Sequence, residues 1–359
     1  AVARKIRKKY LREDVKLFYL GPKDGFSEAL LSKEGIEVKT ITAGKIRRYL
    51  GFKSFFQNIF DVLIRIPVSF FQSLFHIFVI SPDIIFSKGG YGSLAPVVSG
   101  WLLLTPVFLH ESDVIPGLVN RLLSRFSVEI FVSFAAEKTR YFKPEKMICV
   151  GNPIRPELLE GSREKARELL KLSDEERPIM LVLGGSQGSQ RINDVILSIL
   201  PELLSDFELV HQTGKSNLKE IEAEAKVTAP ENLLKHYHVF SFLAEEELKH
   251  AYKIASLVVS RAGSGTIFEI ASLGKPSLLI PLPESAQNHQ LENAYLYSEQ
   301  GAALVIEENN LTPHFFLERV KYLLSRPSSL KEMQLQALAF SRPNAAKIVA
   351  EYLIEYLRH

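Results

Sequence analysis

The feature that most constrains the fold is a hydrophobic run, Leu181-Val-Leu183, that passes directly into the glycine-rich turn Gly184-Gly-Ser-Gln-Gly188. Polar residues then begin a helix near Gln190. Glycine lacks a Cβ and tolerates positive φ, so such a turn lets backbone N–H groups approach a ligand closely. The partial positive charge at the start of the next helix favours an anion there. The stretch predicts a phosphate-binding site in an α/β fold. Tight packing alone also produces such a strand–turn–helix connection.

Length and composition limit the class of protein. A chain of 359 residues suggests two domains of about 150–200 residues each. The single cysteine, Cys149, excludes a disulfide framework and fits a reducing cytoplasm. The first 60 residues hold 14 Lys or Arg against 6 Asp or Glu. This basic region suits an anionic membrane surface or is simply solvated; without interleaved aromatic residues, we expect no nucleic-acid partner.

Short buried strands alternate with helices along the whole chain. This rhythm predicts doubly wound parallel sheets with ligands at the carboxyl ends of the strands. We expect two Rossmann-like domains, residues 1–152 and 153–340, with a cleft between them. A final helix lies within 341–359, and packing back on the first domain is an open alternative for it. The expected strands are 15–20, 36–41, 83–87, 106–110, 129–134, 147–150, 179–183, 207–211, 237–241, 257–260, 277–281 and 303–306.

The stretch from Phe52 to Ile80 is unusually apolar and aromatic. Polar residues and Pro67 interrupt it, so we expect no transmembrane span, and Pro67 should kink or split the helix. Two adjacent apolar stripes at helical spacing make an arc wider than one contact with a sheet buries. The arc is either core or part of a membrane interface beside Lys45, Arg47, Arg48 and Lys53. The candidate membrane patch is Leu63, Ile64, Phe70, Phe71 and Phe75.

Four further motifs accompany the glycine turn in a fixed order. They are Ser87-Lys-Gly-Gly-Tyr-Gly-Ser93, His110-Glu111 with Pro116-Gly117 and Asn120, Gly151-Asn-Pro-Ile-Arg155, and Ser260-Arg-Ala-Gly263 with Glu269. Together with the glycine turn, they make the chain resemble the MurG family of glycosyltransferases. The resemblance covers essentially the whole chain in matching order, which makes it far more specific than one glycine loop.

The resemblance implies a GT-B architecture and an inverting hexosyltransferase. Such an enzyme moves N-acetylglucosamine from UDP-N-acetylglucosamine (UDP-GlcNAc) to the muramoyl 4-hydroxyl of lipid I, giving lipid II for peptidoglycan synthesis. The C-terminal domain would hold the donor, and the N-terminal domain would face the membrane and the lipid-linked acceptor. The expected location is the cytoplasmic face of the cell membrane, as a peripheral protein. Other proteins of cell-wall synthesis are possible partners.

The resemblance also assigns residues to the two substrates. Ser186 and Arg155 would contact the diphosphate, which as a leaving group needs a cation and a helix dipole. Glu269 would bind the ribose hydroxyls, and the Phe242-Leu243 turn would lie against the uracil. The full donor set is Arg155, Gly185, Ser186, Gln187, Gly188, Phe242, Leu243, Arg261, Gly263, Glu269, His289, Gln290 and Asn293. The acceptor set is Gly89, Gly90, Tyr91, Ser93 and Asn120.

The catalytic base is the open point of the resemblance. The family opens with a strand and a glycine–histidine loop, and its favoured base lies there; here Ala1–Tyr10 matches the helix that follows that loop. We therefore expect missing upstream residues, two unpaired neighbouring strands and poor stability. His110 and Glu111 are the catalytic candidates, with Asp113 beside them. No Asp-x-Asp motif occurs, so we expect no metal and no obligatory cofactor.

Two alternatives remain beside the lipid I transferase. One is a GT-B enzyme that builds glycolipids from a UDP-sugar on diacylglycerol. The other is an inactive UDP-sugar-binding homologue, which the missing base loop motivates. The choice of acceptor distinguishes the first alternative from the lipid I transferase. The presence or absence of turnover distinguishes the second.

Overall fold

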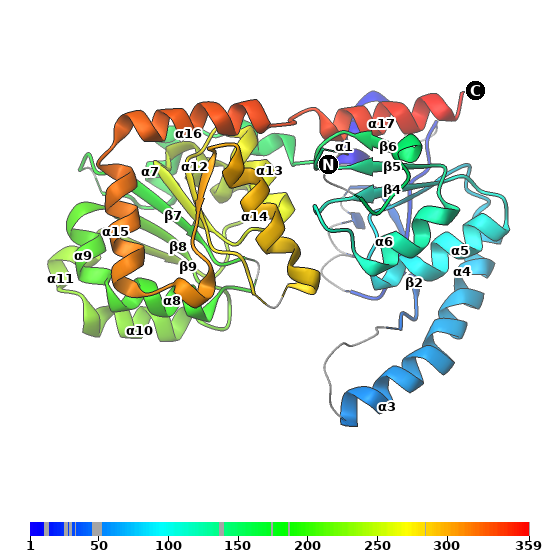
Figure 1. Cartoon of the computed structure of the whole chain (residues 1–359), viewed down its shortest axis with the longest axis horizontal. Helices are drawn as coiled ribbons and strands as arrows, with labels where there is room; N and C mark the ends of the chain where they lie inside the picture. Colours follow the sequence, from blue (N-terminus) through cyan, green and yellow to red (C-terminus); the bar gives the residue numbers. More distant parts are fainter. Residues whose placement is uncertain are drawn as a thin grey trace. The chain divides into compact units, whose positions relative to one another are not determined.

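The computed structural model describes residues 1–10, 14–24, 28, 31–32, 34–44, 52–135, 140–173, 175–185, 187–283 and 285–358, without the side chains of 52–55 and 286. The chain divides into two compact units. The first comprises residues 1–153 together with 344–359, and the second comprises 154–343. Both are α/β units with parallel strands (Figure 1). The C-terminal helix therefore belongs to the first unit.

The second unit is built on one sheet of six parallel strands in the order β12-β11-β10-β7-β8-β9. Its central strand has alternate residues in two hydrophobic cores: Met180 and Val182 face one, and Leu181 and Leu183 face the other. Burial on both faces explains the continuous apolar runs of these strands. The strands are β7 (Ile179–Leu183), β8 (Glu208–Gln212), β9 (Tyr237–Phe240), β10 (Leu257–Ser260), β11 (Ser277–Leu279) and β12 (Ala303–Val305).

Helices cover both faces of this sheet (Figure 1). A short 3₁₀ turn, η6, precedes α7, and Gly161 and Ser162 separate the two. The helices are η6 (Pro156–Glu160), α7 (Arg163–Leu169), α8 (Gln190–Ser198), α9 (Leu200–Asp206), α10 (Leu218–Thr228), α11 (Glu231–Leu234), α12 (Glu245–Ile254), α13 (Ser264–Ser272), η7 (Ala286–Asn288), α14 (His289–Glu299), η8 (Glu308–Asn310), α15 (Pro313–Leu324) and α16 (Pro327–Phe340).

The strand order places a topological switch point between β7 and β10. From β7 the chain adds β8 and β9 on one side, and then β10, β11 and β12 on the other. In such sheets the loops after the two central strands run in opposite directions and leave a crevice at the carboxyl edge. The glycine turn follows β7, and the Arg261–Gly263 segment follows β10, so both border this crevice.

The first unit contains two sheets among its described residues. One is the parallel pair β1-β2, and the other has the order β3-β4-β5-β6. In the described part of this unit, β1 and β3 each have one edge without a strand partner, and the expected missing strand stays a prediction. β1 continues through Gly21-Pro22, which the sequence assigned to a turn, because its pairing with β2 extends to Ile41. The strands are β1 (Phe18–Pro22), β2 (Glu37–Ile41), β3 (Ile85–Ser87), β4 (Val107–Glu111), β5 (Glu129–Val132) and β6 (Met147–Cys149).

The last helix packs on the first sheet core and on the first helix of the chain. Val349 and Leu353 join the core around Phe108 and Phe131, and Ile6 packs with Ala350. The helices of this unit are α1 (Val2–Lys9), α3 (Phe52–Phe60), η1 (Asp61–Arg65), α4 (Ile66–Ile80), η2 (Tyr91–Ser93), α5 (Leu94–Leu102), α6 (Leu118–Leu123), η3 (Ser124–Phe126), η5 (Pro144–Lys146) and α17 (Ala345–Tyr356).

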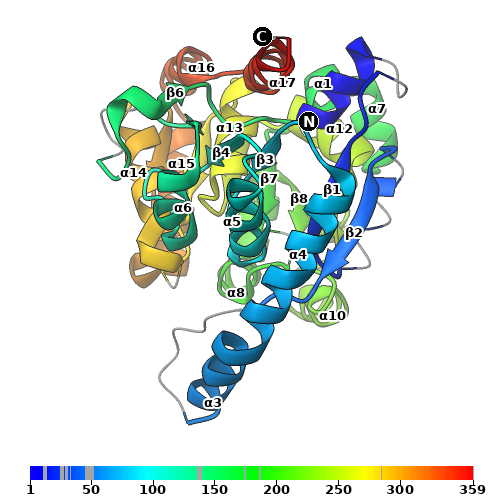
Figure 2. The same ribbon diagram turned by 90° about the vertical axis from the view of Figure 1, so that its right-hand side faces the viewer.

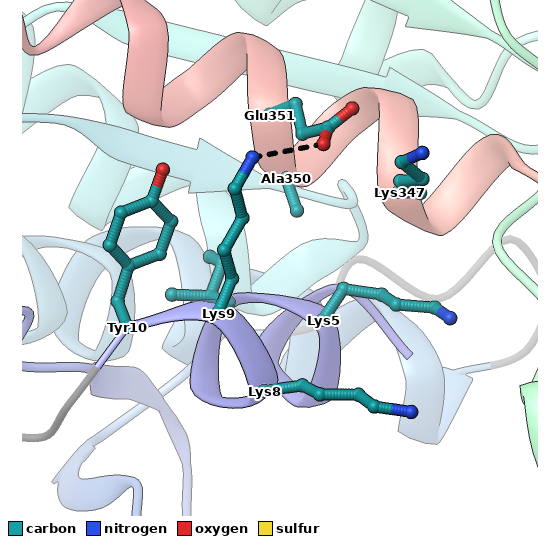
Figure 3. A pocket seen from close by; sticks show the side chains of 8 residues that line it. Lys5, Lys8, Lys9, Tyr10, Lys347, Ala350 and Glu351 are labelled. Atoms are coloured by element: carbon teal, nitrogen blue, oxygen red, sulfur yellow. Dashed lines mark hydrogen bonds and ion pairs between the residues drawn. The ribbon is translucent and has the colours of Figure 1, made fainter.

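A groove of about 210 Å³ lies between α1 and α17. Four of its eight lining residues are lysines, and Lys9 reaches across to Glu351 at 3.1 Å (Figure 3). The groove lies between two helices, and no loop at a carboxyl edge lines it. It is therefore separate from the candidate substrate sites described below.

The helical segment from α3 to α4 exposes large apolar side chains and buries small ones. Its i, i+4 row places Ser69, Ser73 and Ile77 against the unit, where the Ser99 hydroxyl donates to the Phe70 carbonyl at 3.3 Å. Figures 1 and 2 show α4 beside α5, with α3 at its far end. The core interpretation of the whole arc is therefore wrong. The most exposed apolar residues are Phe56, Leu63, Phe71, Phe75, Phe78 and Val79.

Four of the five residues expected in the membrane patch lie on this exposed surface. Leu63, Ile64, Phe71 and Phe75 are exposed, whereas Phe70 is half-buried. Lys45, Arg47 and Arg48 lie outside the described residues, as does the side chain of Lys53. The expected basic border of the patch therefore stays a prediction.

Pro67 changes the helix type and does not split it. The Ile66 N–H bonds to the Asp61 carbonyl, five residues back, which makes Asp61–Arg65 a π-helical turn directly before the proline. A wider turn accommodates a residue that lacks a backbone donor. The helical run Phe56–Ile80 is long and apolar enough to cross a membrane by length and composition alone, and the expectation that it does not span one stays a prediction. One such helix is weak evidence, since core helices meet the same criterion.

Candidate functional site

The glycine turn after β7 is locked on one side and open on the other. A Cβ on Gly188, whose φ is +79°, would lie 1.9 Å from the Thr213 carbonyl oxygen. Gly185 also has a positive φ, +90°, but nothing lies within 4 Å of its Cβ position. The turn is therefore held from below by the segment after β8, while its outer side is accessible to a ligand. Gln187 is exposed in the same turn, and Ser186 lies outside the described residues.

The start of α13 offers a second accessible backbone segment across the switch point. Gly263 caps the helix, and neither Gly263 nor Gly265 has an atom within 4 Å of its Cβ position. The first N–H groups of a helix lack internal partners and carry partial positive charge. Together with the turn after β7, this helix start gives the crevice the chemistry of an anion site.

Arg261 is committed to contacts inside the protein. Its guanidinium donates to Ser189 Oγ at 2.6 Å and to the Ile280 carbonyl at 3.2 Å, and it forms an ion pair with Glu308. Ser189 in turn caps α8 by accepting from the Ile192 N–H. Arg261 therefore joins the loops after β10 and β11 to the helix that follows the glycine turn. Direct contact of Arg261 with a donor stays a prediction.

Arg155 and Glu269, two of the predicted donor residues, contact each other, and their roles toward a donor stay predictions. Arg155 Nη2 is 2.9 Å from Glu269 Oε1, and Arg155 Nε is 3.3 Å from the same oxygen. Tyr252 Oη is 3.5 Å from the other carboxylate oxygen. Burial raises the pKa of Glu269, and the Arg155 charge acts against that shift. The pair thus places one anion-binding and one hydroxyl-binding group side by side.

The remaining donor candidates lie in the loop after β9 and on α14. Phe242 is exposed and Leu243 is buried after β9. Gln290 accepts from the Leu282 N–H at 3.1 Å, and buried Asn293 donates to the Ala262 carbonyl at 3.4 Å. His289 is half-buried at the start of α14.

The backbone before α14 is strained. Gln287 and Asn288 have φ values of +59° and +57°, a region that non-glycine residues rarely occupy. Such conformations cost of the order of 1–3 kcal/mol each and cluster at ligand-binding segments. This strain lies directly before His289 and Gln290, and no sequence pattern pointed to it.

In the first unit, the acceptor candidates gather at the carboxyl edge of the four-stranded sheet. Gly89 and Gly90 follow β3 with φ values of +80° and +86°. A Cβ on Gly89 would lie 2.3 Å from Asn120 Oδ1, whereas nothing lies within 4 Å of the Gly90 position. Exposed Tyr91 and half-buried Ser93 belong to the next turn, and Ser93 Oγ donates to the Gly90 carbonyl at 2.7 Å. Like the glycine turn after β7, this loop is packed on one side, against Asn120 at Gly89, and open on the other side at Gly90.

Glu111 organises the loop after β4. Its two carboxylate oxygens accept from the Asp113 N–H at 3.0 Å, the Gly117 N–H at 3.3 Å and Asn120 Nδ2 at 2.8 Å. Burial raises its pKa, and these donors act against that shift. A carboxylate held by three donors orients its surroundings. Direct catalysis by Glu111 stays a prediction.

His110 is fully buried beside Glu111 and is poorly placed for proton transfer. Its Nε2 lies 3.1 Å from the Gly151 carbonyl oxygen, and Nδ1 has no partner among the described residues. Burial lowers the pKa of His110 to about 3, with the nearby Lys88 charge adding to the effect. A base with so low a pKa is weak at neutral pH. The geometry therefore does not favour the predicted role of His110 as the base.

Lys88 is a residue that sequence reasoning passed over. Its ammonium group donates to Asn152 Oδ1 at 3.1 Å, and burial lowers its pKa while Asp113 and Glu111 raise it. Lys88 is an exposed residue that directly precedes Gly89 and Gly90, so a cation lies beside the open glycine loop. In the sequence, a lysine directly before a glycine pair was the signal that could have indicated this cation.

A buried histidine under the glycine turn makes the second unit sensitive to acid. His211 contacts Tyr237 Oη at 2.8 Å and Asn193 Oδ1 at 3.1 Å, and burial lowers its pKa to about 3. Its folded pKa lies below its unfolded value, so its contribution to stability is present above pH 6.5 and is lost as pH falls. Between pH 7 and pH 5 we expect a loss of about 2 kcal/mol from this group.

The variant His211→Gln tests this expectation. Its stability at pH 7 is expected to be lower, but its change between pH 7 and pH 5 should be smaller than that of the wild type by about 2 kcal/mol. Urea unfolding at the two pH values measures the difference. The exposed His314→Gln variant is the control and should keep the wild-type pH dependence. Equal pH dependence in His211→Gln would contradict the assignment.

The described residues hold no group of three or more His, Cys, Asp or Glu side chains that could bind a metal ion.

Two parallel α/β units, with open glycine loops at a switch point, define the GT-B class of proteins. Solved structures support this fold. *Acinetobacter baumannii* MurG aligns with a TM-score of 0.72 at 22% identity, over 99% of this chain and 95% of that chain. UDP-GlcNAc 2-epimerase from *Neisseria meningitidis*, solved with UDP-GlcNAc, aligns with a TM-score of 0.67 at 15% identity, over 99% and 96%. At these identities the likeness shows the fold alone, and a fold does not decide the reaction.

Sequence comparison goes further. Residues 1–132 match the glycosyltransferase family 28 N-terminal domain, and residues 179–349 match its C-terminal domain. A relative in *Clostridium tetani* is 36% identical over 336 residues, which are 93% of this chain and 89% of the relative. One in *Bacillus thuringiensis* is 38% identical over 322 residues, 88% and 85%. Both are named UDP-N-acetylglucosamine–N-acetylmuramyl-(pentapeptide) pyrophosphoryl-undecaprenol N-acetylglucosamine transferase. The chain belongs to this MurG family of glycosyltransferase family 28.

Proposed function

We propose that this protein transfers N-acetylglucosamine from UDP-GlcNAc to the muramoyl 4-hydroxyl of an undecaprenyl-diphosphate-linked pentapeptide. The observation that carries the proposal is 36% identity over 336 residues to an enzyme named for this reaction. The second unit supports it with an anion site at the switch point and a carboxylate, Glu269, beside it. The first unit supports it with a second open glycine loop next to Lys88, suited to a second diphosphate.

The proposed donor site assigns a role to each group. The N–H groups of the glycine turn and of the start of α13 bind the diphosphate, and Arg155 neutralises the charge that develops on the leaving group. Glu269 accepts hydrogen bonds from the ribose hydroxyls, which requires its carboxylate form. In the free protein Arg155 and Glu269 pair with each other, so donor binding exchanges part of that pairing for contacts with the ligand.

The acceptor separates this proposal from a glycolipid synthase. Purified protein is incubated with labelled UDP-GlcNAc and either the undecaprenyl-diphosphate muramoyl pentapeptide or diacylglycerol. We expect label in the first lipid only, and UDP-glucose should be a poor donor. Label in diacylglycerol would contradict the proposed acceptor. Donor binding without any transfer would leave the inactive UDP-sugar-binding homologue as the better description.

We further propose that the exposed apolar surface of α3 and α4 lies in the membrane interface. Large apolar side chains cover its outer side, while Ser69 and Ser73 face α5. Small residues at the helix contact and large apolar ones outside are typical of helices that pack in lipid. Asp61 is buried and paired with Arg65 at 3.0 Å, which lowers the cost of placing the segment near the bilayer. The lipid-linked acceptor would then be reached from the membrane surface.

Replacing Phe71 and Phe75 by glutamate is expected to weaken binding to anionic vesicles at least ~100-fold, because each buried phenylalanine contributes about 1.5–3 kcal/mol. Both side chains are exposed, so the fold should be retained. Vesicle flotation measures binding, and UDP-GlcNAc affinity should not change. The control Val227→Glu with Leu335→Glu alters two exposed apolar residues of the second unit and should float like the wild type.

Extraction distinguishes an interfacial helix from a spanning one. Alkaline carbonate should release the protein from vesicles if α3 and α4 lie in the interface. Two results together would instead support a spanning helix. The protein would stay in the vesicles after carbonate, and protease would cleave the two segments that flank the helix from opposite sides of the bilayer. Equal flotation of the Phe71 and Phe75 variant and its control would remove the membrane role of this surface.

A further inference from the structure

The structure assigns Gln212 as a positioning residue that ties the glycine turn after β7 to the Phe242-Leu243 turn after β9. This inference rests on the proposed donor site, because it concerns how two parts of that site are held together. Gln212 is the last residue of β8, the strand that lies between β7 and β9 in the sheet. Its side chain is therefore in reach of both turns.

The two ends of its amide make different contacts. Nε2 donates to the Gly185 carbonyl at 2.9 Å, and Oε1 accepts from the Leu243 N–H at 2.9 Å. One partner is an acceptor and the other a donor, so the contacts fix which way the amide points. The side chain is 5% exposed, so neither bond has water as an easy substitute. Among side chains of this length, a neutral amide or a protonated carboxyl satisfies both partners.

Other contacts hold the lower part of the glycine turn. Among the described residues, the Gln212 side chain connects its open part to the turn after β9. Below the glycine turn, Gly188 packs directly on the Thr213 carbonyl, which also accepts from Asn193 at 3.2 Å and Asn217 at 3.0 Å. These bonds involve backbone after β8. The link from the open part of the glycine turn to the turn after β9 runs through the Gln212 side chain. A phosphate on Gly185 and a base against Phe242 are therefore set at a fixed separation.

If Gln212 fixes the separation of the two turns before the ligand binds, its loss should weaken ligand binding. A nucleotide that bridges both turns binds best when neither turn has to be ordered during binding. Without the Gln212 amide, the Gly185 carbonyl and the Leu243 N–H lose their partners and the turns move independently. We expect Gln212→Leu to bind UDP about 30-fold more weakly than the wild type at every pH.

Gln212→Glu supplies a readout that a purely structural role would not move. At pH 7.5 its carboxylate cannot donate to the Gly185 carbonyl, so UDP affinity should fall about 30-fold. Burial raises the pKa of such a carboxyl, and its protonated form can donate at one oxygen and accept at the other, as the amide does. Relative to wild type at the same pH, affinity should return to within about threefold at pH 5.5.

Calorimetric titration of UDP into the full chain at pH 7.5 and 5.5 makes the test, with circular dichroism to verify folding. Gln334→Glu on the exposed side of α16 is the matched control and should bind like the wild type at both pH values. Recovery of Gln212→Glu at pH 5.5, with Gln212→Leu weak throughout, supports the inference. Wild-type affinity in Gln212→Leu would overturn it, and would show that the loss in Gln212→Glu is charge repulsion. No UDP binding by the wild type would instead overturn the proposed donor site.

Discussion

Arg155→Ala is expected to lower kcat/KM for UDP-GlcNAc by about 1,000-fold. Removing a charge-assisted contact that strengthens as the diphosphate leaves typically costs 10²–10³ in rate, in addition to weaker binding. The variant also leaves Glu269 buried without its cation, which raises the pKa of that carboxyl further. The carboxylate binds ribose, so activity falls as pH drops through this pKa. The acid limb of the pH–rate profile should therefore move to higher pH in the variant.

Steady-state kinetics from pH 5 to pH 9 measure both effects. Arg155→Lys keeps the charge but not the two-bond geometry, so its kcat/KM should be intermediate. The exposed Arg319→Ala variant on α15 is the control for loss of a positive charge and should match the wild type. Unchanged donor affinity in Arg155→Ala would show that this arginine serves only to neutralise Glu269.

Gly188→Ala is expected to destabilise the second unit by about 3–4 kcal/mol and to abolish donor binding at moderate temperature. The added Cβ would lie 1.9 Å from the Thr213 carbonyl oxygen and 2.9 Å from Gly214 Cα, both backbone atoms in a packed loop. The positive φ adds strain for any residue other than glycine. Two costs therefore combine at one position.

Gly185→Ala is the matched comparison three residues earlier. It shares the positive φ, at +90° against +79°, but its Cβ would meet no atom within 4 Å. Only the conformational strain remains, about 1 kcal/mol. Urea unfolding, with the second-unit transition identified by its shift on adding UDP, measures both variants. Equal destabilisation of the two would show that the loop relaxes away from Thr213 and that the contact is not rigid.

The sequence predicted the second unit closely because its signals are local. β7 and β10 lie at their expected residues, since a buried apolar run ending in a glycine turn marks a strand end without reference to the rest of the chain. Other strands shift by one to three residues. β4, for example, extends to Glu111 because that residue pairs with Val132. Such boundaries depend on register with a neighbour, which one strand does not encode.

The side-chain partners of the site were less accessible from sequence. Arg261 resembles a donor-binding cation in the sequence, and the structure adds contacts that no motif predicts. It donates to Ser189, 72 residues earlier, and to the Ile280 and Pro281 carbonyls, while its contact with a donor stays a prediction. His110 looked like a base, but its burial and low pKa follow from the strands that surround it. The roles of such residues depend on three-dimensional burial, and a motif records only residue type.

The α3–α4 segment shows a different limit. Its periodicity correctly indicated a helix with a wide apolar arc, yet the face that packs on α5 is the row with Ser69 and Ser73. Amphipathic patterns assume that the apolar face turns inward in water. A helix that meets lipid on its outer side reverses this assumption, so the pattern left core and interface equally open.

Transfer of labelled N-acetylglucosamine to the undecaprenyl-diphosphate muramoyl pentapeptide tests the central claim most directly. With the full chain, UDP-GlcNAc and acceptor in detergent micelles, we expect a labelled disaccharide lipid whose new linkage is inverted relative to the donor. Arg155→Ala should reduce its rate about 1,000-fold, since the same cation supports the leaving group. Folded protein that binds UDP-GlcNAc yet leaves this acceptor unlabelled would contradict the account.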